Sequence, residues 1–373
     1  MDFLRTFHPV GHGAFFTERF YDGLSDTPIF NVVYDCGNKD KTHLKGLINA
    51  TFKKEEHIDL MFISHFDSDH ISGIDFIIKE KHIDANTIIV IPFKFPRVLT
   101  VMTGAYNKIA TTLSALYSAG AYIIGVDNGE LPNNTERVID YEELHNQTHI
   151  QNGTKIRFKQ IWYYVPFMSP ERSSLLDKFQ DALKNNPGID ENRLNDSDYI
   201  NSKQKDIRKL YKNIGDNKSN SSLTIINMNS LLVLSFSADV IESWSDNYCY
   251  HRFCCRYYRC CHHFSLRVSC LYTGDCDLSN SSVFGKVIDF SLKQLQRDAV
   301  ELLQIPHHGS INNYGSHIAN CDQFLHAFIN CDPYYHQRIL SNSLLIDFAK
   351  CRRTPILVTK EISTRFMHYA FIN

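Results

Sequence analysis

The sequence predicts an α/β protein with layered sheets. Short apolar runs alternate along the chain with longer segments that suit helices, and this alternation is typical of the class. The 373 residues are 43% hydrophobic, so the chain can bury a substantial core. We find no internal repeat and no glycine-rich phosphate loop in the sequence. Length alone allows one large domain or two smaller ones, and we expect a single domain over residues 1–373.

Each strand candidate is a short run rich in apolar residues with turn residues at its ends. In chain order these runs are Phe30–Tyr34, Asp59–Ser64, Thr87–Pro92, Ala121–Val126, Lys155–Val165, Ser222–Met228, Leu231–Phe236, Cys270–Thr273, Glu301–Ile305, Ala327–Asn330 and Ile356–Thr359. Helices are expected near 41–52, 71–81, 105–118, 171–186, 198–212, 285–298 and 341–350. The polar stretch 186–222 and the irregular stretch 247–270 interrupt this alternation of strands and helices. We therefore expect insertions near 170–220 and 238–268.

The charges almost cancel, with 39 basic and 41 acidic side chains. The chain therefore lacks the overall positive field of a protein that holds nucleic acid nonspecifically, and such a substrate would need a local basic groove. The start has no signal-peptide pattern, and no run of about 18 apolar residues follows. We expect a cytoplasmic protein that does not contact a membrane, with its 11 cysteines reduced. The oligomeric state stays open.

Four metal-binding residue types crowd into "FISHFDSDHISG", residues 62–73, directly after an apolar run. They are His65, Asp67, Asp69 and His70. Charge at the end of a buried strand is costly unless it is paired, so a partner is implied. Imidazole and carboxylate groups suit zinc, manganese or iron, and four donors in one loop can serve two ions.

Further polar groups follow other predicted strands. Asp35 ends a strand in "VVYDCGN", and Asp275 ends another in "LYTGDCD". His307 and His308 follow a third strand in "LLQIPHHGS", and His336 follows a fourth in "NCDPYYHQR". Strand ends that converge on one edge would gather these groups into a single site, as layered α/β folds commonly do.

In this order, the motifs resemble those of the metallo-β-lactamase superfamily of metallohydrolases. "SHFDSDHISG", "YTGD" and "IPHHGS" are most similar to the branch with the soluble hydrolase domain of the bacterial DNA-uptake competence channel. In that branch an Asp replaces the second His of the usual His-x-His-x-Asp-His signature. The resemblance runs from "PVGHGAFF", residues 9–16, to just past His336. It implies a four-layer αββα sandwich with the site along one edge.

The resemblance also implies a set of metal ligands. His65 and Asp67 would bind a first metal, Asp69 and His70 a second; Asp275 would bridge them, and His336 would complete the second site. The family's third His for the first metal is missing, because no histidine lies between Trp162 and Ser222. Asp216, Asn217, Asn220 or water are the candidates for that place. One or two divalent ions are therefore expected, with zinc first and manganese as the alternative.

The remaining site residues would assist the reaction. Asp35 would support the ligands through hydrogen bonds. Asp69, His308 and His307 form the expected catalytic set, in which one of the two histidines donates a proton or binds a phosphate oxygen. The resemblance implies phosphodiester cleavage by metal-activated hydroxide, with nucleic acid or a nucleotide as substrate. The alternatives are a small-molecule ester or thioester hydrolase and a catalytically degenerate binding module.

Two sets of residues remain outside this hypothesis. His8, His12 and His368 look like ordinary core or surface histidines. Residues 247–270, "NYCYHRFCCRYYRCCHHFSLRVSC", invite a zinc-knuckle interpretation, but adjacent Cys pairs suit it poorly. An irregular insertion, or a stretch read in a non-native frame, is the better interpretation, and contact of its Arg and Tyr residues with nucleic acid is only weakly indicated.

Overall fold

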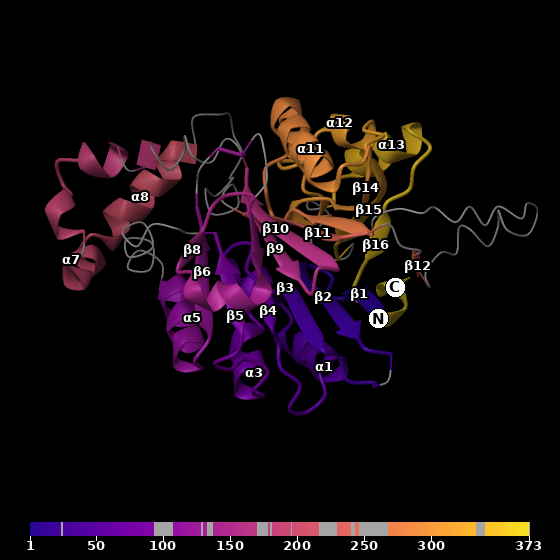
Figure 1. Cartoon of the computed structure of the whole chain (residues 1–373). Coiled ribbons are helices and arrows are strands. Elements are labelled where there is room, and N and C mark those ends of the chain that lie inside the picture. Colours follow the sequence, from indigo (N-terminus) through magenta and orange to yellow (C-terminus); the bar gives the residue numbers. More distant parts are fainter. Residues whose placement is uncertain are drawn as a thin grey trace, which may run out of the picture.

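The computed structural model has two sheets packed face to face between two layers of helices (Figure 1). It describes residues 1–23, 25–92, 107–127, 130–132, 137–169, 178–179, 181–194, 196–215, 230–239, 243–245, 268–332 and 340–372. Three hydrophobic clusters fill the spaces between the four layers. The fold is therefore the αββα sandwich expected from the sequence.

The first sheet carries the N-terminal half of the site. Within the described residues its strand order is β12 (Ser243–Ser245), β17 (Phe366–Phe371), β1 (Asp2–Phe7), β2 (Gly13–Tyr21), β3 (Phe30–Asn38), β4 (Leu60–Phe62), β5 (Ile88–Ile91), β6 (Tyr122–Val126) and β8 (His149–Ile150). Strands β3 to β8 run parallel, whereas β17, β1, β2 and β3 pair antiparallel. Pairing of β1 with β17 brings the two ends of the chain together (Figure 1).

The second sheet carries the other half of the site. Its order is β16 (Ile356–Val358), β15 (Phe324–Asn330), β14 (Val300–Gln304), β13 (Ser269–Tyr272), β11 (Leu231–Ser237), β10 (Trp162–Met168), β9 (Lys155–Phe158) and β7 (Val138–Asp140). Strands β13 to β16 are parallel, and β11 is antiparallel to β13. The expected single strand Lys155–Val165 is wrong. It is the hairpin β9–β10, whose turn holds Lys159 and Gln160 at positive φ.

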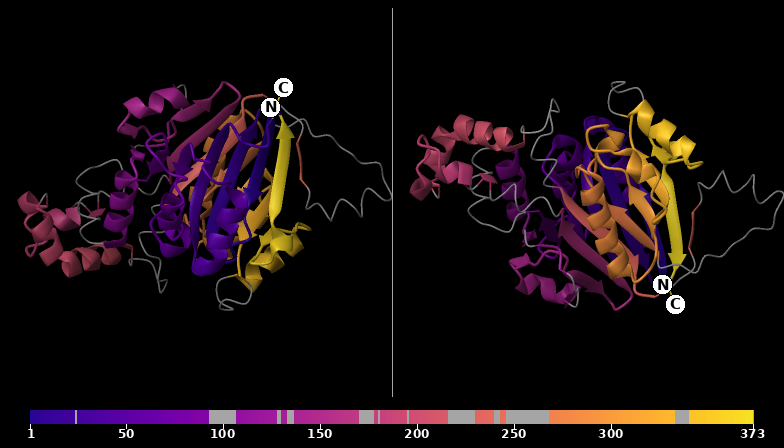
Figure 2. Two further views of the ribbon diagram at one scale, coloured as in Figure 1. Left: turned by 90° about the horizontal axis from the view of Figure 1, so that it is seen from below. Right: turned by 90° about the horizontal axis from the view of Figure 1, so that it is seen from above.

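Helices cover the outer face of each sheet, as the views from below and above show (Figure 2). The first sheet is covered by α1 (Lys41–Thr51), α3 (Ile74–Lys79) and α5 (Asn107–Ser118), and the second by α11 (Ser281–Leu295), α12 (Ser316–Ala319) and α13 (Asn342–Lys350). Helix α11 starts four residues before the expected 285, because the side chain of Asn280 caps the backbone N–H groups of Ser282 and Val283. Among the described helices, none is long and apolar enough to cross a membrane.

Both expected insertions fall partly outside the described residues. The helix expected at 198–212 is two helices, α7 (Ser197–Ser202) and α8 (Gln204–Gly215), which lie to one side of the sandwich (Figure 1). The strand expected at Ser222–Met228, half of the helix expected at 171–186 and most of 238–268 lie outside the described residues. Strand β12 belongs to the second stretch, and it pairs with β17 at the sheet edge.

Candidate metal centre

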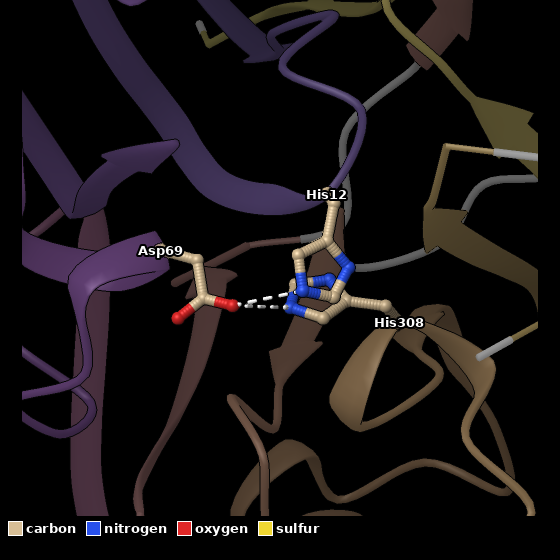
Figure 3. A group of neighbouring side chains, drawn as sticks. All are labelled: His12, Asp69 and His308. Carbon is tan, nitrogen blue, oxygen red and sulfur yellow. Dashed lines mark ion pairs between the residues drawn. The ribbon is translucent and has the colours of Figure 1, made fainter. Parts of the chain in front are cut away.

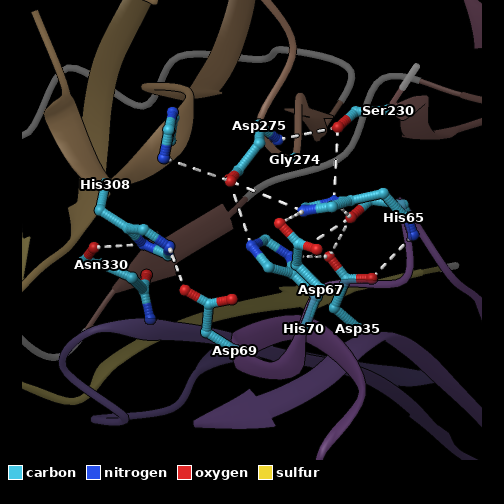
Figure 4. A network of polar contacts seen from close by, with 12 residues as sticks. Asp35, His65, Asp67, Asp69, His70, Ser230, Gly274, Asp275, His308 and Asn330 are labelled. Carbon is cyan, nitrogen blue, oxygen red and sulfur yellow. Dashed lines mark hydrogen bonds and ion pairs between the residues drawn. The ribbon is translucent and has the colours of Figure 1, made fainter. Parts of the chain in front are cut away.

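The expected site residues that the structure describes lie at one edge of the sandwich (Figure 4). Asp35 lies within β3, and His65 and Asp67 follow β4. Asp69 and His70 belong to the short helix α2 (Ser68–Ile71). From the second sheet, Asp275 follows β13, while His307 and His308 form a 3-10 turn after β14. The edge thus combines side chains that are far apart in sequence.

His65, His70 and Asp275 form the most buried cluster of donors. The Nε2 atom of His70 lies 3.1 Å from Oδ1 of Asp275, and Nε2 of His65 lies 3.6 Å from Oδ2 of the same carboxylate. One ligand atom from each of the three residues falls within 4.8 Å of the others. All three side chains are buried. They could hold one metal ion between them.

Asp35 fixes the orientation of His70. Its Oδ1 atom accepts a hydrogen bond from the backbone N–H of Ser64 at 2.7 Å, and its Oδ2 atom accepts one from the Ser64 hydroxyl at 2.6 Å. The same Oδ2 atom lies 2.8 Å from Nδ1 of His70. This network assigns the imidazole proton to Nδ1, so that the lone pair of Nε2 faces Asp275. Asp35 thus contacts both His70 and the backbone next to His65.

Ser230 contacts both His65 and Asp275. Its hydroxyl accepts a hydrogen bond from the backbone N–H of Asp275 at 3.1 Å and lies 3.4 Å from Nδ1 of His65. The sequence pattern missed it. The available signal was its position directly before β11, because an antiparallel strand begins beside the point where its neighbour, β13, ends. The residues expected as a third ligand of the first metal lie outside the described part of the chain; they are Asp216, Asn217 and Asn220.

A second cluster joins Asp69 to two histidines (Figure 3). Nε2 of His12 lies 3.0 Å from Oδ2 of Asp69, and Nε2 of His308 lies 3.8 Å from the same oxygen. His12 comes from the loop between β1 and β2, and the sequence suggested only an ordinary core or surface histidine there. Asp69 was expected to act with His70 and His336. The structure instead places its carboxylate beside His12 and His308, and His336 lies outside the described residues.

His307 and Asp67 line the more open part of the edge. The amide of Asn313 donates to the backbone oxygen of Asp275 at 2.8 Å, so its Oδ1 atom faces Nδ1 of His307 at 2.7 Å. Nε2 of His307 then lies 3.6 Å from Asp275, with 26% of its side chain exposed. The side chain of Asp67 is 39% exposed, and its Oδ2 atom lies 3.9 Å from Nε2 of His65. His307 is therefore oriented and still reachable from solvent.

Burial and mutual charge set the protonation of the cluster. Burial, together with the charge of His70, lowers the pKa of His65 to about 4. Burial also lowers the pKa of His70, but Asp275 and Asp35 outweigh it and raise that pKa well above its usual value. The pKa of Asp275 falls well below its usual value, because His307, His70 and His65 outweigh the opposing effect of burial. Without a metal these carboxylates favour a protonated His70, and an ion bound at Nε2 would replace that proton.

The donors fit a divalent cation. Among the described residues, the buried Nε2 atoms of His65, His70 and His308 make no hydrogen bond, although carboxylate oxygens lie nearby. Leaving such groups without a partner is costly in a protein interior, whereas an ion between them would satisfy them together. Imidazole nitrogen with carboxylate oxygen is a donor set for zinc, manganese or iron.

Comparison with known proteins gives a distant structural likeness. No protein-family model and no curated protein sequence matches this chain. Among solved structures, the chain is similar to the metallo-beta-lactamase fold protein YhfI from Bacillus subtilis, with 10% sequence identity and a TM-score of 0.25. The match covers 45% of this chain and 54% of that one, so this chain spans about half the length of the protein it matches.

Proposed function

We propose that the protein is a metal-dependent hydrolase whose centre is held by His65, His70 and Asp275. The observation that carries this proposal is the convergence of two buried Nε2 atoms on one carboxylate, with no hydrogen bond to satisfy them within the described part of the chain. Zinc is the first candidate ion and manganese the second, because both accept nitrogen and oxygen donors. A site of this kind supplies Lewis acidity and an activated water when it is loaded.

The protein groups around the centre would orient the reaction. Asp35 holds His70 with its Nε2 lone pair directed inward. Ser230 contacts both His65 and the backbone of Asp275, so it ties the two sheets together at the site. His307, held by Asn313, has an Nε2 atom beside Asp275 and a partly exposed side chain. We assign to His307 the delivery of a proton to the leaving group.

Phosphodiester cleavage is the reaction we favour, with nucleic acid or a nucleotide as substrate. The support is the sequence resemblance to a DNA-degrading hydrolase domain, together with an oriented imidazole that can serve a departing alkoxide. An alkoxide leaving group needs a proton, whereas a nitrophenolate does not. The identity of the leaving group therefore gives a direct test of the role of His307.

The test is a substrate panel measured with and without a chelator. We expect chelator-sensitive hydrolysis of single-stranded DNA, RNA or a cyclic dinucleotide in preference to an acyl ester. His307→Ala should lower kcat by about 10²–10⁴-fold on these substrates, the usual range for a general acid, and by less on a nitrophenyl phosphodiester. The exposed His149 on β8 provides the matched control, and His149→Ala should leave turnover unchanged.

Each other outcome rejects a defined part of the proposal. Preference for an acyl ester would reject phosphodiesterase activity in favour of a small-molecule hydrolase. Bound metal without turnover of any substrate would favour a binding module. Absence of bound metal, with none taken up on titration, would reject the metal centre itself.

A further inference from the structure

We propose that His12, Asp69 and His308 form a second metal site beside the first. The proposal rests on the proposed function, because both ions would belong to one centre. It differs from the arrangement that the sequence implied, in which Asp69 and His70 shared the second ion with His336. Its new element is His12, whose sequence context gave no sign of a ligand.

The three donors converge on one point from three separate elements. Nε2 of His12 and Nε2 of His308 both face Oδ2 of Asp69, at 3.0 and 3.8 Å (Figure 3). The three ligand atoms lie within 4.8 Å of one another. Both imidazoles are buried, and Asp69 keeps 14% of its side chain exposed. The group is therefore compact and partly open to an entering ion.

His308 is oriented as a ligand, and its burial disfavours the doubly protonated ring that a proton donor at Nε2 would need. Its Nδ1 atom lies 3.0 Å from the backbone oxygen of Asn330, which can only accept, so the ring proton resides on Nδ1. The Nε2 lone pair then points into the cluster, and this buried atom makes no hydrogen bond within the described residues. Metal-binding histidines are commonly held in this way by a backbone carbonyl. The side chain is 3% exposed, so water does not readily satisfy it.

The backbone around His308 is held in an uncommon conformation. His307 and His308 have φ values of 49° and 55°, in the left-handed region that non-glycine residues rarely adopt. Such residues cost about 1–3 kcal/mol each and persist where surrounding structure holds them. Here the backbone N–H of His307 is bonded to the oxygen of Gly274, and the N–H of Ser310 is bonded to the oxygen of His307. The turn brings Nε2 of His307 to Asp275 and Nε2 of His308 to Asp69.

The loop that carries His12 is pressed against α2. A Cβ atom on Gly13 would lie 2.3 Å from the oxygen of Gly37 and 3.0 Å from the oxygen of Asp69. A Cβ atom on Gly37 would lie 2.3 Å from the carbonyl carbon of Asp69. The three backbones therefore approach closely only because two of them lack side chains. This approach brings His12 to the Asp69 carboxylate.

The two sites would lie side by side. The rings of His70 and His308, one from each cluster, have centroids 5.6 Å apart. Two imidazoles with one carboxylate suit zinc, manganese or ferrous iron, so both clusters accept the same class of ion. The competing explanation is that His12 only donates a hydrogen bond to Asp69 and binds nothing.

The test counts ions per chain by equilibrium dialysis against Zn²⁺ and by the absorption spectrum on Co²⁺ titration. We expect two ions in the wild-type protein and one in both His12→Ala and His12→Gln. Glutamine retains a hydrogen bond to Asp69 but is a poor ligand, so retention of two ions by His12→Gln would overturn the proposal. Thermal unfolding of each variant in chelator, unchanged from the wild type, shows that the fold survives.

Two further results separate this inference from the proposed function. A wild-type protein that binds one ion, retained in His12→Ala and lost in His70→Ala, would overturn the second site and leave the first intact. A wild-type protein that binds no ion would overturn both. His149→Ala, which alters an exposed histidine of β8, should bind as many ions as the wild type.

Discussion

His70 has a different carboxylate on each of its two ring nitrogens. Asp35 lies 2.8 Å from Nδ1, and Asp275 lies 3.1 Å from Nε2. The contact with Asp35 has the geometry of a hydrogen bond, whereas the contact with Asp275 does not. A histidine held in this way keeps its Nε2 lone pair directed at the position that an ion would occupy. The orienting contact of Asp35 should therefore contribute to metal binding at Nε2 of His70.

Replacing Asp35 should weaken binding without removing a ligand. In Asp35→Asn, one oxygen that now accepts from Ser64 and His70 becomes either an N–H donor or a weaker acceptor. We expect metal affinity to fall by about 10–100-fold, as is typical for loss of a partner behind a ligand. Competition with a chromophoric chelator measures the Kd. An unchanged Kd would show that Asp35 does not orient His70.

His8 should make the stability of the protein depend on pH. Burial, followed by the charges of Arg365 and Arg19, lowers the pKa of His8 from 6.5 to about 3. Between these values the unfolded chain binds a proton at His8 and the folded protein does not, so the free energy of unfolding falls as pH falls. At pH 5 the loss from this one group is about 2 kcal/mol relative to pH 7.

The variant His8→Gln isolates this effect. Urea denaturation in chelator at pH 7 and pH 5 should show that the wild type loses about 2 kcal/mol more than the variant between the two pH values. The comparison across pH cancels any constant cost of losing the contact with Thr17. Equal losses in both proteins would mean that His8 is protonated in the folded state near its usual pKa.

At the scale of elements, the site depends on how closely α2 packs against β3. A Cβ atom on Gly37 of β3 would meet the carbonyl carbon of Asp69 and the backbone nitrogen of His70, each at 2.3 Å. These are backbone atoms, so no side-chain rotation can relieve the clash. Any side chain at position 37 must therefore displace the helix that carries two of the donors.

Gly37→Ala should both destabilise the protein and reduce metal binding. We expect a loss of about 1–3 kcal/mol, the usual cost of overpacking, together with weaker binding of every ion that uses Asp69 or His70. The matched control is Gly46→Ala in α1, where an added Cβ meets nothing within 4 Å and alanine should stabilise the helix by about 1 kcal/mol. Urea denaturation and metal titration of both variants distinguish them. Tight binding in Gly37→Ala would contradict the close-packing argument.

The parallel strands were the easiest elements to predict from sequence. The runs that became β4 and β5 are continuously apolar, as strands covered on both faces are. Strands β1, β2 and β17 were missed because each buries polar residues. Arg5, Glu18 and His368 break the apolar pattern, yet all three are buried because they pair with polar groups inside the sandwich.

The candidate site was predictable only where a motif marks it. His65, His70, Asp275 and His308 follow strands within recognisable sequence runs. His12 and Ser230 belong to no recognisable motif. Each directly precedes an antiparallel strand, whereas the motif residues follow parallel strands. Their contacts arise from tertiary packing between segments more than 50 residues apart, as with His12 and Asp69. Local pattern does not encode that proximity.

At the scale of the whole molecule, a buried polar network joins the two sheets. Glu18 of the first sheet accepts hydrogen bonds from the hydroxyls of Tyr164, Ser235 and Tyr272 of the second sheet. It also pairs with Arg5 at 2.7 Å, with both side chains almost fully buried. Because the metal centre takes donors from both sheets, a network that fixes their relative position also fixes the site.

Glu18→Gln should be strongly destabilising. It leaves the Arg5 guanidinium buried without its counter-charge, and breaking one partner of a buried pair costs about 3–5 kcal/mol. The double variant Arg5→Met, Glu18→Leu removes both charges and should cost less than the single change. Urea denaturation of the three proteins measures the free energies of unfolding. A single variant as stable as the wild type would show that the network does not hold the sheets together.

The most direct test of the metal centre is X-ray diffraction from crystals grown with Zn²⁺, recorded on both sides of the zinc absorption edge. The account predicts an anomalous peak about 2.0–2.2 Å from Nε2 of His65, Nε2 of His70 and a carboxylate oxygen of Asp275. A crystal whose zinc lies only at surface residues, with those three side chains arranged as they are here and no peak between them, would contradict it.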